Sequence, residues 1–285
     1  MGNEKIKRLR LLRGSAKERK KSGLFTAEGV KIFKEAPKEA VCETYVSESF
    51  ARENACLLAD CAFYIVEDGL FERICDTKTP QGIITVFRRP SCRIEDLPEN
   101  GPLIVVLENV QDPGNIGTII RTAEGAGASV ILGDGCADVF SPKAVRSTMG
   151  SLFRVPIVFE SDLTEAVKKL KALGVKVYAA HLAAEKYYDE LDYSEGTAFL
   201  VGNEGNGLSK ELADEADIVI THGGAGTILT AIKKGKKIIA VVNFPPRQIA
   251  DFFSEVLVLG TYSQRGVVLI TPDKPEEVKD GDKLG

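Results

Sequence analysis

Short apolar runs alternate with amphipathic stretches in the second half of the chain. The runs have the length and continuous hydrophobicity of buried strands and lie at residues 103–107, 129–132, 155–159, 175–179 and 198–201. Apolar residues at helical spacing predict helices at residues 116–126, 142–149, 163–173 and 208–215. This alternation is typical of a parallel sheet covered by helices on both faces, so the sequence predicts an α/β fold. Ligands of such sheets bind at the carboxyl ends of the strands, here in the loops at 108–116, 133–141, 180–188 and 202–207.

A less regular pattern occupies the first part of the chain. It predicts helices at residues 5–21, 26–36 and 49–61 and strands at residues 44–47, 62–66 and 82–87. Residues 88–102 contain three prolines and a glycine among charged side chains, a composition typical of interdomain linkers. We therefore expect a small N-terminal α/β domain in front of the parallel sheet.

The net charge of −4 hides a basic leading segment. Residues 1–21 contain nine Lys and Arg against two Glu, whereas the remaining chain contains 28 basic and 39 acidic residues. A basic segment on an acidic body is the arrangement that a polyanion-binding arm would have. The alternative is a solvated helix face without a ligand, and charge alone leaves both interpretations open.

Composition excludes several classes of protein. The six cysteines form no C-x-x-C pair and the two histidines are His181 and His222, so no zinc or other metal site is expected. The longest apolar runs have five or six residues, which is too short to span a membrane, and the charged N-terminus does not resemble a secretory signal. We expect a cytoplasmic protein with reduced thiols. The sequence has no P-loop, and the glycine spacing at 202–207 is not that of a dinucleotide-binding loop.

The most informative stretch is residues 109–123, at the end of the first predicted strand of the parallel sheet. Asp112, Pro113 and Gly114 form a predicted turn, Asn115 can cap the following helix, and Arg121 lies nearly two turns further along. An arginine in this position can bind a phosphate or a carboxylate. The alternatives are a surface ion pair for Arg121 and a simple helix cap for Asn115.

This stretch resembles the first motif of the SpoU (TrmH-type) RNA 2′-O-ribose methyltransferases of the SPOUT superfamily. Residues 141–156 are similar to the middle segment of that family and residues 198–209 to its second motif. Residues 25–29 and 76–82 look like parts of the substrate-binding domain that precedes the catalytic domain in many members. Together these matches cover about residues 4–215 in the order of the family.

The resemblance implies a trefoil-knotted catalytic domain, a homodimer, S-adenosylmethionine as methyl donor and ribosomal or transfer RNA as acceptor. It assigns Arg121 and Asn115 to positioning the RNA and the attacking ribose hydroxyl. Guanidinium is protonated at ordinary pH, so Arg121 is not expected to act as the base in its resting form. The implied cofactor contacts are Gly202, Glu204, Gly207, Ile220 and Leu229, and the implied RNA phosphate contacts in the basic segment include Arg8, Arg10, Arg13 and Lys17.

The resemblance ends near residue 215, because the third motif of the family is absent. Residues 216–243 are instead similar to the C-terminal half of glycosyltransferases that bind UDP-N-acetylglucosamine, in which His222 would contact the sugar nucleotide. The sequence thus predicts an RNA-binding domain at 1–97, a methyltransferase core at 98–215 and a divergent segment at 216–285. Two alternatives to an active methyltransferase stay open: an RNA-binding protein without catalysis and a UDP-N-acetylglucosamine-binding glycosyltransferase subunit.

Overall fold

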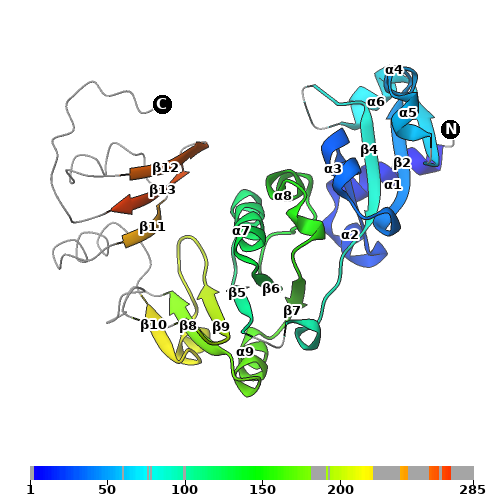
Figure 1. The fold of residues 1–285 in the computed structure, drawn as a ribbon. Coiled ribbons are helices and arrows are strands. Elements are labelled where there is room, and N and C mark those ends of the chain that lie inside the picture. The colour runs from blue at the N-terminus through cyan, green and yellow to red at the C-terminus, as the bar shows by residue number, and fades with distance from the viewer. Residues whose placement is uncertain are drawn as a thin grey trace, which may run out of the picture.

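The described strands of the computed structural model form three sheets (Figure 1). The structure describes residues 3–59, 61–75, 77, 79–98, 101–180, 191, 193–220, 238–242, 257–262 and 265–270. A four-stranded sheet lies in the N-terminal part, a six-stranded sheet in the middle and a three-stranded sheet in the C-terminal part. The α/β class predicted from the sequence is confirmed.

The N-terminal domain is a mixed sheet with helices on both faces. Its strands are β1 (Leu24–Glu28), β2 (Val41–Ser47), β3 (Phe63–Val66) and β4 (Ile83–Arg88), in the order β1-β4-β2-β3. Its helices are α1 (Asn3–Gly14), α2 (Ala16–Ser22), α3 (Val30–Glu35), η1 (Lys38–Ala40), α4 (Glu48–Glu53), α5 (Ala55–Leu58) and α6 (Asp68–Ile74). One buried cluster joins α1 and α6 to the sheet, and a second joins α3, α4 and α5 to it.

All three predicted helices of this domain are wrong in part, since the helix expected at residues 49–61 is divided into α4 and α5. The helix expected at residues 26–36 begins only at Val30, because residues 24–28 pair with β4 as an antiparallel strand and Gly29, at φ 119°, turns the chain. The helix expected at residues 5–21 is two helices, since the Ser15 side chain accepts from the Glu18 amide and starts α2. Its predicted end is confirmed, because Gly23 caps α2 at φ 67°.

The second domain is the predicted parallel sheet. Its strands are β5 (Leu103–Leu107), β6 (Ser129–Gly133), β7 (Ile157–Glu160), β8 (Lys176–Ala180), β9 (Thr197–Val201) and β10 (Ile218–Ile220). They form the order β10-β8-β9-β5-β6-β7, and each neighbouring pair is parallel. The helical elements are η2 (Ile94–Asp96), α7 (Pro113–Ala126), α8 (Pro142–Thr148), η3 (Ser151–Phe153), α9 (Leu163–Ala172) and α10 (Lys210–Asp214).

Helices cover both faces of this sheet, as the continuous apolar strands require. Side chains of α7 and α8, among them Ile116, Ile120 and Val145, form one buried cluster with one face of the sheet. Side chains of α9 and α10 form the other cluster, which includes Ile104 and Val106 of the central strand β5. Both faces of β5 are covered by helices. A polar side chain pointing to either face of β5 would therefore lower the stability of the protein.

The two domains share a hydrophobic cluster. Phe25 of β1 and Phe87 of β4 belong to the same buried cluster as residues of α7 and α8, and the rings of Phe25 and Phe140 lie 5.0 Å apart. The predicted linker at 88–102 is also packed, since Ile94 and Leu97 are buried against the α9 face of the sheet. The division at residue 97 stays a prediction, and the contacts show that the two parts pack as neighbours.

A buried arginine reinforces this junction. Arg19, which is 4% exposed, donates to the carbonyl oxygens of Leu12 and Arg13 at 2.6 and 2.8 Å. Its Nε donates to Asp138 of the second domain at 2.6 Å. A buried guanidinium is stable only where its donors find acceptors, and Arg19 finds them at the end of α1 and across the junction.

The described part of the C-terminal segment begins by extending the parallel sheet with β10. Strands β11 (Ile238–Val242), β12 (Leu257–Tyr262) and β13 (Arg265–Ile270) form an antiparallel sheet in the order β11-β13-β12. Residues 221–237, which include Leu229 and the stretch that the resemblance assigns to the knot, lie outside the described residues. None of the described helices is long and apolar enough to cross a membrane.

We predict that Arg19→Ala destabilises the protein by about 2 to 3 kcal/mol, because the carbonyls and Asp138 lose their charged donor. Urea denaturation followed by circular dichroism measures the change in the free energy of unfolding. The matched control is Lys20→Ala, because the Lys20 pair with Asp134 spans 3.5 Å between exposed side chains and should contribute less than about 0.5 kcal/mol. Equal effects of the two substitutions would contradict the structural role of Arg19.

Candidate functional site

The candidate site lies at the carboxyl edge of the parallel sheet, between β5 and β9. These strands are hydrogen-bonded neighbours, with Leu107 paired to Val201 at their ends. The loop that precedes α7 and the loop that precedes α10 therefore leave the sheet side by side. The first and second motifs, about 90 residues apart in the sequence, meet at this edge.

Asp112 is the cap of helix α7. Its carboxylate accepts from the backbone amides of Gly114 at 2.5 Å and Asn115 at 3.0 Å, and Lys143 of α8 donates to it at 3.1 Å. Burial opposes ionisation of Asp112, but the Lys143 ammonium and the two amides lower the pKa of its carboxyl below the usual value. The alternative of a simple cap for Asn115 is thus wrong, because Asp112 occupies that position and α7 starts at Pro113.

Glu204 joins the two motifs. Its carboxylate accepts from the backbone amides of Gln111 and Asp112, both at 3.1 Å, and from the Asn115 side chain at 2.9 Å. Although burial raises the pKa of Glu204, these donors lower it below its ordinary value. The ionised carboxylate thus fixes both the backbone turn and the Asn115 amide group.

Three loops are tied together around Asn109. The Asn203 side chain donates to the Asn109 carbonyl at 2.8 Å, and the Gln111 side chain donates to the Gly135 carbonyl at 2.6 Å. Asn109 has a positive φ of 54°. A Cβ on Gly135 would lie 1.7 Å from the Asn109 side-chain oxygen, so a side chain there would require the Asn109 side chain to move. The loop after β6 therefore belongs to the same rigid assembly.

A further pair at this edge, Glu108 and Ser209, was not singled out from the sequence. Ser209 donates to the Glu108 carboxylate through its backbone amide at 2.6 Å and its hydroxyl at 2.7 Å. The same hydroxyl accepts from the Leu212 amide and caps α10. The signal in the sequence was a serine at the start of the helix predicted at residues 208–215, together with an acidic residue at the end of a strand.

The glycine loop at 202–207 is closed on itself. The backbones of Asn203 and Gly207 exchange two hydrogen bonds of 2.9 Å. A Cβ on Gly202 would approach the Gly207 carbonyl carbon to 2.1 Å, whereas a Cβ on Gly207, at φ 72°, would meet no atom within 4 Å. Gly202 is therefore required by the loop itself, and the space beside Gly207 is open to a ligand.

Arg121 is an exposed residue of α7, six positions after Asn115. Over the described residues the structure gives Arg121 no ion-pair partner, so the surface ion pair considered from the sequence is not found there. Six helical residues correspond to about 9 Å along the axis and to about 120° around it. The Arg121 side chain is thus available to a ligand at the same helix whose first turn carries Asn115.

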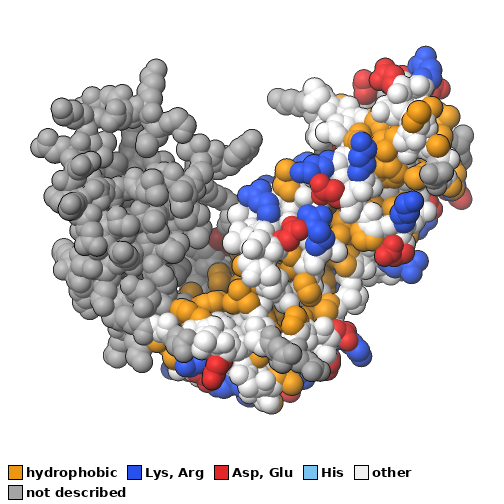
Figure 2. Space-filling view, viewed as in Figure 1, with side chains coloured by type: hydrophobic (Ala, Val, Ile, Leu, Met, Phe, Trp, Pro, Cys, Tyr) orange, Lys and Arg blue, Asp and Glu red, His pale blue; other side chains and the backbone are white. Residues whose placement is uncertain are grey.

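The residues of the basic segment that are predicted to contact RNA differ in their exposure to solvent and in their ion pairs. Arg10 and Lys17 are exposed, and Arg8 is paired with Glu43 at 3.0 Å. Arg13 is buried and lies 3.6 Å from the Glu28 carboxylate, a position that does not fit a contact with an external phosphate. On the face shown in Figure 2, basic side chains are interleaved with acidic ones.

The predicted cofactor contacts are described only in part. Gly202, Glu204 and Gly207 lie in the loop after β9, and Ile220 ends β10, whose neighbour β8 separates it from β9. The Ile220 side chain and the whole of Leu229 lie outside the described residues. The structure therefore brings Asn115 and Glu204 into contact and leaves the pairing of the glycine loop with Ile220 and Leu229 a prediction.

Three family models match the chain. Residues 102–226 match the SpoU rRNA Methylase family, and residues 3–85 match the MRM3-like substrate binding domain. Residues 208–247 match the Glycosyltransferase family 28 C-terminal domain, which overlaps the end of the first match. These matches agree with the similarities noted in the sequence.

Whole relatives show the same similarity. The chain is 36% identical over 235 residues to the 23S rRNA (guanosine(2553)-2′-O)-methyltransferase RlmP of Bacillus subtilis, covering 81% of this chain and 92% of the relative. An rRNA methyltransferase structure from Sinorhizobium meliloti is 33% identical with a TM-score of 0.68, covering 81% and 92% of the two chains. The AviRb methyltransferase of Streptomyces viridochromogenes in complex with AdoMet is 26% identical with a TM-score of 0.70, covering 79% and 90%.

We predict that Gly202→Ala destabilises the glycine loop, because its Cβ would collide with the Gly207 backbone. Overpacking of this kind costs about 1 to 3 kcal/mol, which urea denaturation can measure. Gly205→Ala is the matched control, since the nearest atom to its Cβ is the Asn203 side-chain oxygen at 3.5 Å. A Gly202→Ala variant as stable as Gly205→Ala would contradict the close approach.

The depressed pKa of Glu204 predicts a pH-dependent contribution to stability. A carboxyl with a folded pKa below its unfolded value stabilises the protein above the unfolded pKa, and this contribution is lost as the pH falls through the folded value. We expect Glu204→Gln to cost less than about 1 kcal/mol at pH 7, since the carboxylate is exposed and screened by solvent, and progressively less below about pH 4.5. Denaturation at several pH values tests this, with exposed Glu72→Gln as the control. A pH-independent difference would refute the ionised bridge.

Proposed function

Because the chain belongs to the SpoU rRNA methylase family, we propose that it transfers a methyl group from S-adenosylmethionine to a ribose 2′-hydroxyl of ribosomal or transfer RNA. The observation that carries the proposal is the contact between the two motifs, in which Glu204 holds Asn115 and the loop before α7 in one arrangement. Alignment of the two reactants is the principal task in a displacement at a methyl carbon.

The described residues fit a methyl donor at the glycine loop. The space beside Gly207 is open, and the glycines leave the backbone accessible to a close ligand. Gly202, Glu204 and Gly207 would hold S-adenosylmethionine together with Ile220 and Leu229, and Glu204 would act by fixing the loop. When bound, S-adenosylmethionine supplies a methyl group on a positively charged sulfur.

Arg121 and Asn115 position the acceptor in this proposal. The Arg121 guanidinium is a permanent cation with five donors, which suits a phosphate next to the reacting ribose. Asn115 donates to Glu204 through its amide nitrogen, and this bond fixes the position of its side chain for aligning the acceptor. Arg121 thus attracts the backbone of the RNA while Asn115 aligns the hydroxyl.

The exposed members of the basic segment contact RNA phosphates further from the reaction. Arg8, Arg10 and Lys17 would contribute affinity that depends on salt and carries no sequence information. Arg13 is left out of this set because it is buried. We further propose that the active form is a cytoplasmic homodimer.

We predict that Arg121→Ala lowers the rate of methyl transfer at least about 100-fold, because the acceptor loses its charged contact. Transfer of labelled methyl groups to unmodified ribosomal and transfer RNA transcripts measures the rate. Calorimetry should show unchanged binding of S-adenosylmethionine to this variant. Exposed Arg73→Ala, in the N-terminal helix α6, is the control.

Three outcomes would contradict the proposal. Failure of the wild-type chain to bind S-adenosylmethionine at millimolar concentration would remove the enzymatic activity and favour an RNA-binding protein without catalysis. Unchanged transfer by Arg121→Ala would contradict the role of that residue. A rise in melting temperature with UDP-N-acetylglucosamine, and none with S-adenosylmethionine, would favour a glycosyltransferase subunit.

A further inference from the structure

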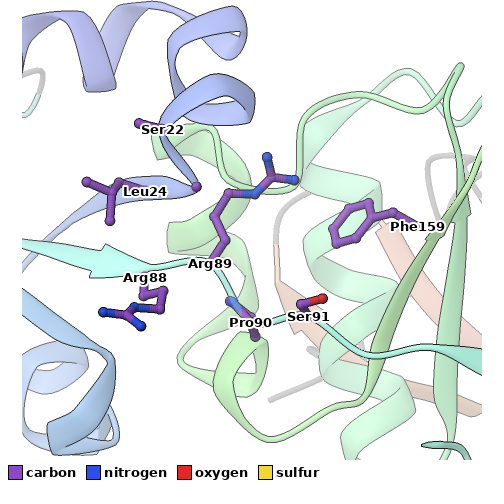
Figure 3. A pocket seen from close by; sticks show the side chains of 8 residues that line it. Ser22, Leu24, Arg88, Arg89, Pro90, Ser91 and Phe159 are labelled. Atoms are coloured by element: carbon purple, nitrogen blue, oxygen red, sulfur yellow. The ribbon is translucent and has the colours of Figure 1, made fainter.

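A groove opens at the junction of the two domains, away from the motifs of the family. It is lined by the end of α2 and the start of β1, the end of β4 with the following chain, and one residue of β7 (Figure 3). The lining residues are Ser22, Gly23, Leu24, Arg88, Arg89, Pro90, Ser91 and Phe159. One aromatic ring and two arginines from different domains thus line a common depression, and Figure 3 shows the Arg88 side chain directed away from Phe159.

Phe159 is the unusual member of this group. It is 40% exposed, although other aromatic rings of the junction, such as Phe25 and Phe140, are fully buried. Its ring centroid lies 5.7 Å from that of Phe140, so the two rings are packed against each other. One side of the Phe159 ring is therefore packed on a rigid core and part of the ring is open to solvent.

The two arginines have different environments. The Arg89 guanidinium lies 4.3 Å from the Phe140 ring centroid and 5.3 Å from that of Phe159, and Figure 3 shows Arg89 and Phe159 directed toward each other. Arg88 is exposed, and across the residues that the structure describes it has no carboxylate partner. The groove thus combines the Arg89 guanidinium, which contacts two aromatic rings, with the Arg88 guanidinium, which has no carboxylate partner among the described residues.

The groove lies on the same edge of the sheet as the candidate site. Phe159 is next to the carboxyl end of β7, and β6 separates β7 from β5. The loop after β6 connects the two places, since Lys20 near the groove pairs with Asp134 at 3.5 Å and Gln111 of the site donates to Gly135. The acidic side chains of this loop, Asp134 and Asp138, are neutralised by α2 through Lys20 and Arg19.

We propose that this groove is a stacking subsite for one unpaired nucleotide of the RNA substrate, with the base on Phe159 and the flanking phosphates at Arg88 and Arg89. The proposal rests on the proposed function, because it assumes an RNA substrate. A single exposed ring beside guanidinium groups suits a nucleobase, which stacks on aromatic and guanidinium planes and carries a charged backbone. A double helix could not use it, since its bases are stacked on one another.

Fluorescence anisotropy with a labelled 12-nucleotide oligouridine and a 12-base-pair RNA duplex tests the subsite. We expect Phe159→Ala to weaken binding of the single strand about 5- to 100-fold and to leave binding of the duplex unchanged. Phe159→Tyr should restore single-strand affinity because it keeps the ring. Leu173→Ala is the control, since Leu173 is 66% exposed on a different part of the surface, after α9.

Arg88→Ala keeps the proposal testable should Phe159→Ala unfold the junction. It should lower the slope of log affinity against log salt concentration by about one, as expected for loss of one phosphate contact. An unchanged slope, or wild-type single-strand affinity in a folded Phe159→Ala variant, would overturn the subsite. Methyl transfer by the wild type separates the two proposals. If the Phe159→Ala variant binds the single strand more weakly but the wild type transfers no methyl group, the subsite is supported and the function is refuted. If the wild type transfers methyl groups but the variant binds the single strand normally, only the function is supported.

Discussion

The Glu204 carboxylate is the interaction on which the site depends. It accepts from two backbone amides and one side-chain amide of the loop before α7, so it defines the position of a turn and of Asn115 at once. The contact is possible only because β5 and β9 are adjacent parallel strands whose carboxyl ends meet. Sheet order thus places two motifs in contact, and the carboxylate then holds them in one geometry.

Close packing of loop backbones is the second constraint at this edge. Gly202 has no room for a side chain because the Gly207 backbone occupies the space, and the Asn109 side chain occupies the space beside Gly135. These glycines permit three loops to hydrogen-bond to each other over short distances. Gly202, which the sequence predicts to approach a ligand, is also required by the contact of the loop with itself, and within this loop a Cβ on Gly207 would meet no atom within 4 Å.

The sequence predicted the second domain better than the first, for a physical reason. Strands buried on both faces are continuously apolar, so β5, β6 and β9 could be found within about one residue. Strand β1 was missed because Thr26 and Ala27 carry no strong local signal and become a strand by pairing with β4, about 60 residues away. The burial of Arg19 depends on Asp138, 119 positions distant, and local charge patterning could not reveal it. The same limit applies to Asn115, whose partner Glu204 lies 89 positions later.

The order of the strands also separates the N-terminal domain from the divergent segment at residues 216–285. The N-terminal domain packs on α7 and α8, beside the β6-β7 end of the sheet, whereas the divergent segment follows β10 at the opposite end. The site between β5 and β9 lies between them. Asn115, Arg121 and the junction groove come from the chain before the divergent segment, and of the residues proposed to hold the methyl donor only Ile220 and Leu229 lie within that segment. The proposed contacts to RNA therefore depend on the part of the chain before the divergent segment, whereas the proposed methyl-donor site depends on the divergent segment as well.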